Sequence, residues 1–184
     1  HLPIQSGSDK ILKLMNRNHT VKEYLNIFER LKKVNSKIEF SSDFIIGYPE
    51  ETEQDFKNTL NLIEKINFIN SYSFIYSARP GTVAFDLKLI EKKVSIQRLE
   101  KIQKKLYANQ TNKNKLLENQ IINVLTENQT NDMTRTFGRS EYMTSVVFDG
   151  KKEHIGKILP VKIKKFNRTT LFGELVRDSN QKVA

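Results

Sequence analysis

Apolar residues in the first part of the chain recur at helical spacing, and elsewhere they form short unbroken runs. The helical spacing predicts a helix over residues 9–17, a second opened by the capping box Thr20-x-x-Glu23, and a third that begins after Thr52. The unbroken runs predict strands over residues 38–46 and about 71–76, and a further strand that ends before residue 5. Strands and helices that alternate at this spacing are typical of parallel βαβ units, so we expect an α/β fold.

Polar runs that contain glycine or proline follow the predicted strands. They cover residues 5–8, 47–52 and 77–82. In α/β barrels and open parallel sheets, the carboxyl ends of the strands build the active site. We therefore expect these three runs to converge on one site, in a sheet that three strands leave incomplete.

The pattern changes twice in the rest of the chain. One long helix with a narrow apolar stripe is predicted from about residue 95 to 117. Short strands separated by turn residues follow, over residues 121–126, 143–148, 158–166 and 171–176. Such strands predict a small all-β barrel. We place the boundary near residue 117, which gives an α/β domain over 1–117 and a β domain over 118–184.

The chain has a net charge of +10, and two stretches hold the excess. Residues 88–117 contain nine Lys or Arg and two Glu, whereas residues 151–168 contain seven and one. The first stretch is equally consistent with a solvated lysine face. In the second, two lysines alternate with apolar residues, which turns both lysines outward from a strand. The candidate contacts for RNA or DNA are Lys162, Lys164, Arg139 and Arg168.

Two residues on the expected site face suit a ligand. Gly47 ends a buried strand, where a glycine lets the backbone approach a ligand closely. Arg79 can hold a carboxylate or phosphate through a two-pronged hydrogen bond, although a surface cation beside a Pro-Gly turn explains it equally well. The acidic residues between 50 and 55 precede a helix, whose dipole already favours carboxylates there.

Residues that commonly bind metals or attack substrates are scarce. The chain has no cysteine, which excludes a disulfide framework and a cysteine-held iron–sulfur cluster within these residues. His19 and His154 have no companion at a metal-ligand spacing. Ser6 lacks the Gly-x-Ser-x-Gly turn of a nucleophile elbow. We therefore predict no catalytic or metal-binding residue in this chain.

Three runs and the last third of the sequence resemble one enzyme family. The later barrel strands of the radical S-adenosylmethionine (SAM) methylthiotransferases are similar to HLPIQSGSDKILKLMNRNHT, SSDFIIGYPEETEQDF and YSFIYSARPGT. The residues from about 118, which include GRSEY and LFGELV, resemble the TRAM domain of these enzymes. The resemblance implies the C-terminal part of a TIM-like βα barrel, followed by a small OB-like barrel that binds RNA.

The resemblance also implies a radical reaction on tRNA. In this family a reduced iron–sulfur cluster cleaves SAM to a 5′-deoxyadenosyl radical, which activates a C–H bond for sulfur insertion. The implied cofactors are SAM and two 4Fe–4S clusters, whose cysteine ligands would lie in a preceding part of the protein. The implied SAM contacts are Gln5, Ser6, Ile45 and Gly47, with Arg79 near cofactor or substrate. Glu50 departs from the glycine that the family usually has.

The sequence leaves more than one function open. The residues around Ser6 and Arg79 favour the branch that modifies N6-isopentenyladenosine at position 37 of tRNA. The branch that modifies threonylcarbamoyladenosine shares much of this pattern, whereas the branch that acts on ribosomal protein S12 typically has histidine where Ser6 stands. A cluster-free RNA-binding module is the alternative from another class.

The sequence also bears on where the protein acts and what it binds. The chain opens at His1 directly in a motif, so we expect the C-terminal portion of an enzyme, inactive by itself. The sequence contains no run of 18 apolar residues and no leader, so we expect neither a membrane span nor a signal peptide. We expect a cytoplasmic protein whose partners are SAM and the tRNA anticodon arm, and we expect no association with a membrane.

Overall fold

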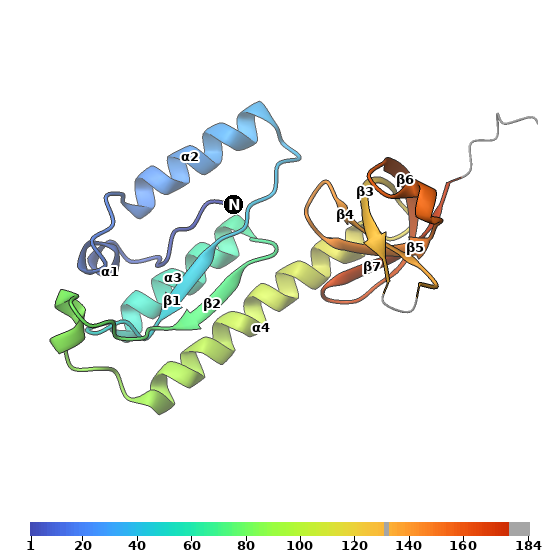
Figure 1. The fold of residues 1–184 in the computed structure, drawn as a ribbon. Helices are drawn as coiled ribbons and strands as arrows, with labels where there is room; N and C mark the ends of the chain where they lie inside the picture. Colours follow the sequence, from blue (N-terminus) through green and yellow to red (C-terminus); the bar gives the residue numbers. More distant parts are fainter. Residues whose placement is uncertain (131–132, 177–184) are drawn as a thin grey trace, which may run out of the picture. The chain divides into compact units, whose positions relative to one another are not determined.

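The computed structural model describes residues 1–130 and 133–176, and it divides into two compact units, His1–Asn109 and Gln110–Ala184. The first unit mixes helices with a parallel sheet, and the second is a closed β barrel (Figure 1). The predicted α/β fold with an appended all-β barrel is therefore confirmed. Helix α4 (Lys92–Leu116) contributes residues to both units and begins three residues before the predicted helix.

A short parallel sheet organises the α/β unit. Strand β1 (Asp43–Ile46) pairs with β2 (Tyr72–Ile75), and helix α3 (Glu53–Ile66) connects them. Gln5 adds a single parallel bridge to Phe44 in place of a third strand. Helices α1 (Asp9–Leu14) and α2 (Val21–Val34) precede β1, and the 3-10 helix η1 (Val83–Asp86) follows β2.

Two capping boxes fix where the helices start. The Thr20 hydroxyl accepts the Glu23 N–H, and the Glu23 carboxylate accepts the Thr20 N–H, which confirms the predicted box at the start of α2. Thr52 and Asp55 form the same arrangement at the start of α3. These reciprocal bonds satisfy N–H groups that a helix start would otherwise leave unpaired.

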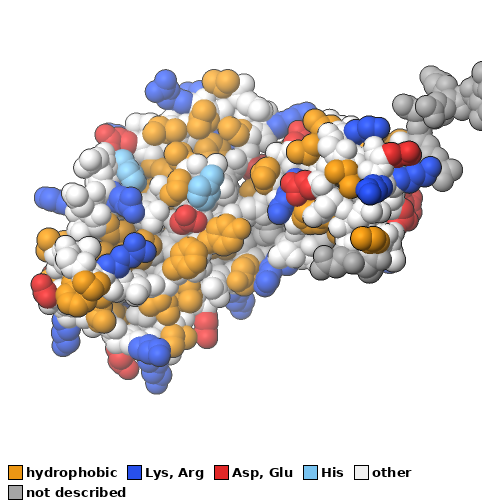
Figure 2. All heavy atoms as spheres, viewed as in Figure 1, with side chains coloured by type: hydrophobic (Ala, Val, Ile, Leu, Met, Phe, Trp, Pro, Cys, Tyr) orange, Lys and Arg blue, Asp and Glu red, His pale blue; other side chains and the backbone are white. Residues whose placement is uncertain are grey.

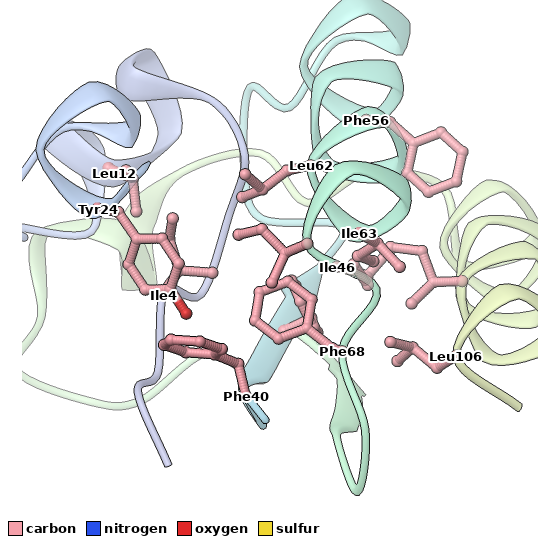
Figure 3. Packing of buried hydrophobic residues seen from close by; sticks show 13 residues of the cluster. Ile4, Leu12, Tyr24, Phe40, Ile46, Phe56, Leu62, Ile63, Phe68 and Leu106 are labelled. Atoms are coloured by element: carbon pink, nitrogen blue, oxygen red, sulfur yellow. The ribbon is translucent and has the colours of Figure 1, made fainter. Parts of the chain in front are cut away.

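The core of this unit lies where α3 and α4 pack on β1. Phe44 and Ile46 of β1, Phe56 and Ile63 of α3 and Ile102 of α4 are each at most 1% exposed. Phe68, whose ring lies in this cluster (Figure 3), packs edge-on against Phe44, with ring centroids 5.4 Å apart. Burial of one such side chain stabilises the fold by roughly 1.5–3 kcal/mol, so this cluster holds the carboxyl ends of the strands in place.

The predicted strand over residues 38–46 is too long, because only its last four residues form β1. Phe40 is buried against the ring of Phe28 on α2, with ring centroids 4.9 Å apart. Its carbonyl accepts the N–H of Ile69, which lies outside β2. The apolar run therefore ends in a loop that packs against a helix.

Five strands close the barrel of the second unit in the order β3-β4-β5-β7-β6. They are β3 (Ile121–Gln129), β4 (Thr136–Ser140), β5 (Ser145–Asp149), β6 (Ile158–Phe166) and β7 (Thr170–Leu175), with the 3-10 helix η2 (Lys152–His154) before β6. Alternate residues point inward, and Val124, Val146, Val161, Ile163 and Leu171 are fully buried.

Strand β4 was not among the predicted strands, although its last three residues begin the GRSEY run that carried part of the resemblance. Its inward positions are Thr136, Gly138 and Ser140, so the period-2 pattern contains no apolar residue. A Cβ at Gly138 would lie 2.4 Å from the Leu125 carbonyl oxygen on β3. The predicted strand from Met143 begins instead at Ser145, because Met143 has a φ of 59° in the preceding turn.

Candidate functional site

The α/β unit has an open cavity of about 1370 Å³ at the carboxyl ends of β1 and β2. Its walls come from α1 and the residues after it, from the ends of both strands, and from the loop that leads into η1. The runs 47–52 and 77–82 both contribute lining residues, but the run 5–8 does not. Two of the three predicted strand-end runs therefore meet at one cavity.

The floor of the cavity is apolar. Ile45 and Phe74 are register partners on β1 and β2, and the Phe74 side chain is 55% exposed. Hydrophobic side chains lie at the surface over this sheet in Figure 2. Tyr48 and Tyr76 stand edge to face beside them, with ring centroids 4.8 Å apart. Burial raises the pKa of Tyr48, so its hydroxyl stays protonated and donates to the Leu14 carbonyl at 2.8 Å.

Four cations line the same cavity. Lys10, Lys13 and Arg17 follow one another at spacings of three and four residues, and Arg79 reaches it from the loop after β2. Only Arg79 was singled out from the sequence. The helical spacing of the other three was the available signal, but the same spacing is also usual on a solvated helix face.

Of the four residues predicted to contact SAM, Ile45 alone is among the lining residues of this cavity. Ser6 is 1% exposed, and its hydroxyl accepts the Ser8 N–H at 3.2 Å. Gln5 has a φ of 75°, and its backbone bonds to Asp43 and Ile45 attach it to the edge of β1. A SAM contact stays a prediction for all four residues, including Gly47.

Gly47 has a local reason to be glycine. Its φ is +71°, and a Cβ there would lie 2.4 Å from the hydroxyl oxygen of Ser95 on α4. Its N–H donates to Glu51 Oε2 at 3.0 Å. Contact with α4 therefore requires a glycine at this position without reference to a ligand.

A buried ion pair anchors the loop after β1. Glu51 Oε2 lies 2.8 Å from Arg98 Nη1, and both residues are less than 8% exposed. Arg98 also donates to the Glu51 carbonyl at 3.0 Å and lies over the Phe56 ring. Burial outweighs these contacts and raises the pKa of Glu51. Only a helix-dipole role was predicted for Glu51, because its partner is 47 residues away.

Asp55 connects the start of α3 to α1. Its carboxylate accepts the Ser8 hydroxyl at 2.6 Å and the Thr52 hydroxyl at 2.7 Å, and Lys10 Nζ lies 3.7 Å away. Partial burial opposes ionisation, but these hydrogen bonds and the lysine charge outweigh it and lower the pKa of Asp55. The ionised carboxylate therefore stabilises the folded state.

We expect Asp55→Asn to reduce the free energy of unfolding at neutral pH by about 1–3 kcal/mol, because it disrupts charge-assisted hydrogen bonds. The lowered pKa means that the contribution is present above the ordinary value of 3.8 and is lost as pH falls through the folded-state pKa. Urea unfolding at several pH values would measure this. Glu29→Gln, on the exposed side of α2, is the control, and an equal loss in both variants would contradict the prediction.

The barrel confirms the predicted alternation on β6. Val161 and Ile163 are fully buried, whereas Lys162 and Lys164 are exposed. Lys164 Nζ lies 3.1 Å from Glu174 Oε2, which partly neutralises that lysine. Contact of these lysines with RNA stays a prediction.

The two predicted arginine contacts already have protein partners. Arg139 Nε lies 3.7 Å from Glu127 Oε2, and its guanidinium stands over the Phe137 ring. The Arg168 carbonyl accepts the Asn114 amide at 3.1 Å. Arg139 is therefore held on the barrel surface between β3 and β5 before any ligand binds.

Within residues 1–130 and 133–176, no three His, Asp or Glu side chains are grouped as metal ligands. No helix in the described part of the chain has both the length and the hydropathy to cross a membrane.

Comparison with known families gives each unit an assignment. Residues 1–63 match the radical SAM superfamily, and residues 115–176 match the TRAM domain. The radical SAM match covers α1, α2, β1 and most of α3, and the TRAM match covers all five strands of the barrel.

Curated relatives match almost the whole chain. The chain is 64% identical over 184 residues to the tRNA-2-methylthio-N(6)-dimethylallyladenosine synthase of Pelagibacter ubique (strain HTCC1062). It is 45% identical over 177 residues to the enzyme of the same name from Ruthia magnifica, and 43% identical over 183 residues to that from Histophilus somni. It spans 41%, 40% and 39% of these relatives, respectively, or about two fifths of their length.

Proposed function

We propose that this chain is part of a radical SAM methylthiotransferase that adds a methylthio group to C2 of N6-isopentenyladenosine at position 37 of tRNA. The observation that carries the proposal is 64% identity, over the full 184 residues, to a synthase named for that product. The order of the two assigned regions supports it, because a radical SAM region and a TRAM domain combine a reaction centre with an RNA-binding module. We place this activity in the cytoplasm.

The α/β unit suits a role as one part of a larger barrel. Its sheet has two strands, and Tyr72 and Phe74 on β2 are more than half exposed. Further strands from a preceding part of the protein would cover such apolar side chains. We therefore infer that this unit supplies the later strands of the barrel.

The chain's residues fit SAM better than they fit an iron–sulfur cluster. Ile45 offers an apolar contact at the cavity, and the partly buried residue Gln5 lies beside it at the edge of β1. SAM, when bound, supplies the group that abstracts hydrogen and the methyl group of the product. With no cysteine in the chain, the two 4Fe–4S clusters would need ligands from outside these residues.

The barrel would hold the anticodon arm of the tRNA. A base that undergoes chemistry leaves its stack, so contacts to the RNA backbone elsewhere must hold the RNA while the base is out. Lys162 and Lys164 present two ammonium groups on one exposed strand face, and Arg139 and Arg168 are the further candidate contacts of the barrel. Phosphate contacts of this type release counterions, which makes binding dependent on salt.

We expect replacement of Lys162 and Lys164 together by glutamine to weaken tRNA binding. The slope of log affinity against log salt should flatten by roughly one to two units, because up to two phosphate contacts are lost. Filter binding between low and moderate salt would measure the slope, and SAM affinity should not change. A parental slope in the double variant would make this face only a solvated surface.

A hybrid enzyme tests the proposed function. In it, this chain replaces the matching segment of the Pelagibacter ubique relative. In cells that lack the modification, the hybrid should convert N6-isopentenyladenosine to its 2-methylthio derivative, as measured by mass spectrometry of tRNA nucleosides. Methylthio transfer to threonylcarbamoyladenosine instead would assign the other branch. RNA binding without any product would favour the cluster-free RNA-binding module.

A further inference from the structure

The cavity at the ends of β1 and β2 has a strongly cationic lining. Lys10, Lys13 and Arg17 come from α1 and the turn after it, and Arg79 comes from the loop after β2. Glu50 is the acidic side chain among the described lining residues, so four cations and one anion give a formal charge of +3. We name Lys10, Lys13, Arg17 and Arg79 the cationic rim.

We propose that the cationic rim binds phosphate groups of the tRNA strand next to the target adenosine, as a second RNA contact separate from the β barrel. The proposal rests on the proposed function and adds a site on the α/β unit. Arginine forks and lysine ammonium groups are the side chains that bind phosphate most effectively. The exposed Phe74 ring on the floor offers a face on which an unstacked base can lie.

Hydrogen bonds fix the backbone that carries the rim. The Ser8 side chain accepts the Ile11 N–H at the start of α1, and the Arg17 N–H donates to the Leu12 carbonyl at 2.9 Å. The Tyr48 hydroxyl holds the Leu14 carbonyl between them. The cationic side chains of this segment are therefore attached to an ordered backbone, which reduces the conformational entropy that is lost when RNA binds.

Local structure does not account for the rim. Lys13 lies in the last turn of α1, where the helix dipole favours a cation, but Arg17 lies beyond the helix and Arg79 on another loop. Within the described residues, no carboxylate lies within 4 Å of the charged groups of Lys13, Arg17 or Arg79, and all three side chains are exposed. The Lys10 ammonium group already has a protein partner, since it donates to the Glu50 carbonyl at 2.7 Å.

Charge favours RNA over SAM as the ligand of the rim. SAM has a sulfonium and an ammonium group against one carboxylate, so it carries a net positive charge at neutral pH. The four rim cations therefore attract a strand with one negative charge per nucleotide more strongly than they attract SAM. The carboxylate of SAM is nevertheless the other anion that these cations can bind, and the experiment separates the two.

The test replaces Lys13 and Arg17 together by glutamine in the hybrid enzyme. The probe is the anticodon stem-loop RNA with isopentenyladenosine at position 37. We expect weaker binding and a salt slope flatter by roughly one to two units, with SAM affinity unchanged. The control is Lys22→Gln with Lys33→Gln on α2, which removes the same charge from exposed positions outside the cavity lining.

Each outcome supports or contradicts phosphate binding by the cationic rim. A slope like that of the control variant would overturn the proposal, and weaker SAM binding with a parental RNA slope would assign the cations to the cofactor. Thermal unfolding of both variants shows whether the fold is retained, and Arg79→Gln repeats the test from the other wall of the cavity. If the parental hybrid binds RNA through the rim but forms no methylthio product, the proposed function fails and the phosphate site stands.

Discussion

Gly47→Ala is expected to destabilise the α/β unit by about 2–4 kcal/mol, of which about 1 kcal/mol is backbone strain and about 1–3 kcal/mol is overpacking. Two effects add at this position. The φ of +71° disfavours any residue with a side chain, and the new Cβ would lie 2.4 Å from the Ser95 hydroxyl oxygen on α4. Urea unfolding followed by circular dichroism would measure the loss.

Gly81→Ala is the matched control for Gly47→Ala. Its φ of +82° imposes the same backbone strain, but no atom lies within 4 Å of its Cβ position. We expect it to cost about 1 kcal/mol. Ser95→Ala in the Gly47→Ala background should recover part of the loss, since it removes the closest atom. Equal losses at the two glycines would show that the α4 contact is unimportant.

Arg98→Met should have the second large effect, a loss of about 3–5 kcal/mol of unfolding free energy at neutral pH. The substitution leaves the Glu51 carboxylate buried without its ion-pair partner, and it also removes the bond to the Glu51 carbonyl. Burial raises the pKa of Glu51. The deficit should therefore shrink as the pH falls through that raised pKa, because a neutral carboxyl costs less to bury.

Lys105→Met is the control for the ion pair. Lys105 also lies on α4 and pairs with Glu64 at 3.0 Å, but that pair is exposed. Its loss should cost less than about 1 kcal/mol. The double variant Glu51→Gln with Arg98→Met should recover part of the Arg98→Met loss. A deficit that does not change with pH would contradict the buried carboxylate as its cause.

The fold could be predicted from the sequence wherever one residue type marks one structural role. The Thr20-x-x-Glu23 box located the start of α2, and the alternation of lysines with Val161 and Ile163 gave the faces of β6. Strand β4 was missed because its inward residues are small and polar. The length of β1 was overestimated because Phe40 is buried without being in a strand.

The candidate site was harder to predict, because its parts are distant in the sequence. Runs of polar residues after the strands correctly indicated that residues near 48 and 79 would meet. Nothing local distinguishes Lys13 or Arg17 from the other lysines and arginines on the surface. Likewise, the partner of Glu51 lies on a helix 47 residues later, where a stripe of lysines suggested only a solvated face.

The most direct test of the proposed function is the product that the purified hybrid enzyme makes in a single turnover. Two stem-loop RNAs would be compared, one with N6-isopentenyladenosine at position 37 and one with threonylcarbamoyladenosine. We expect the first RNA to gain one methylthio group at C2 in place of hydrogen, as seen in the nucleoside mass, and the second RNA to be unchanged. Methylthio transfer to the second RNA alone, or to neither while both still bind, would contradict it.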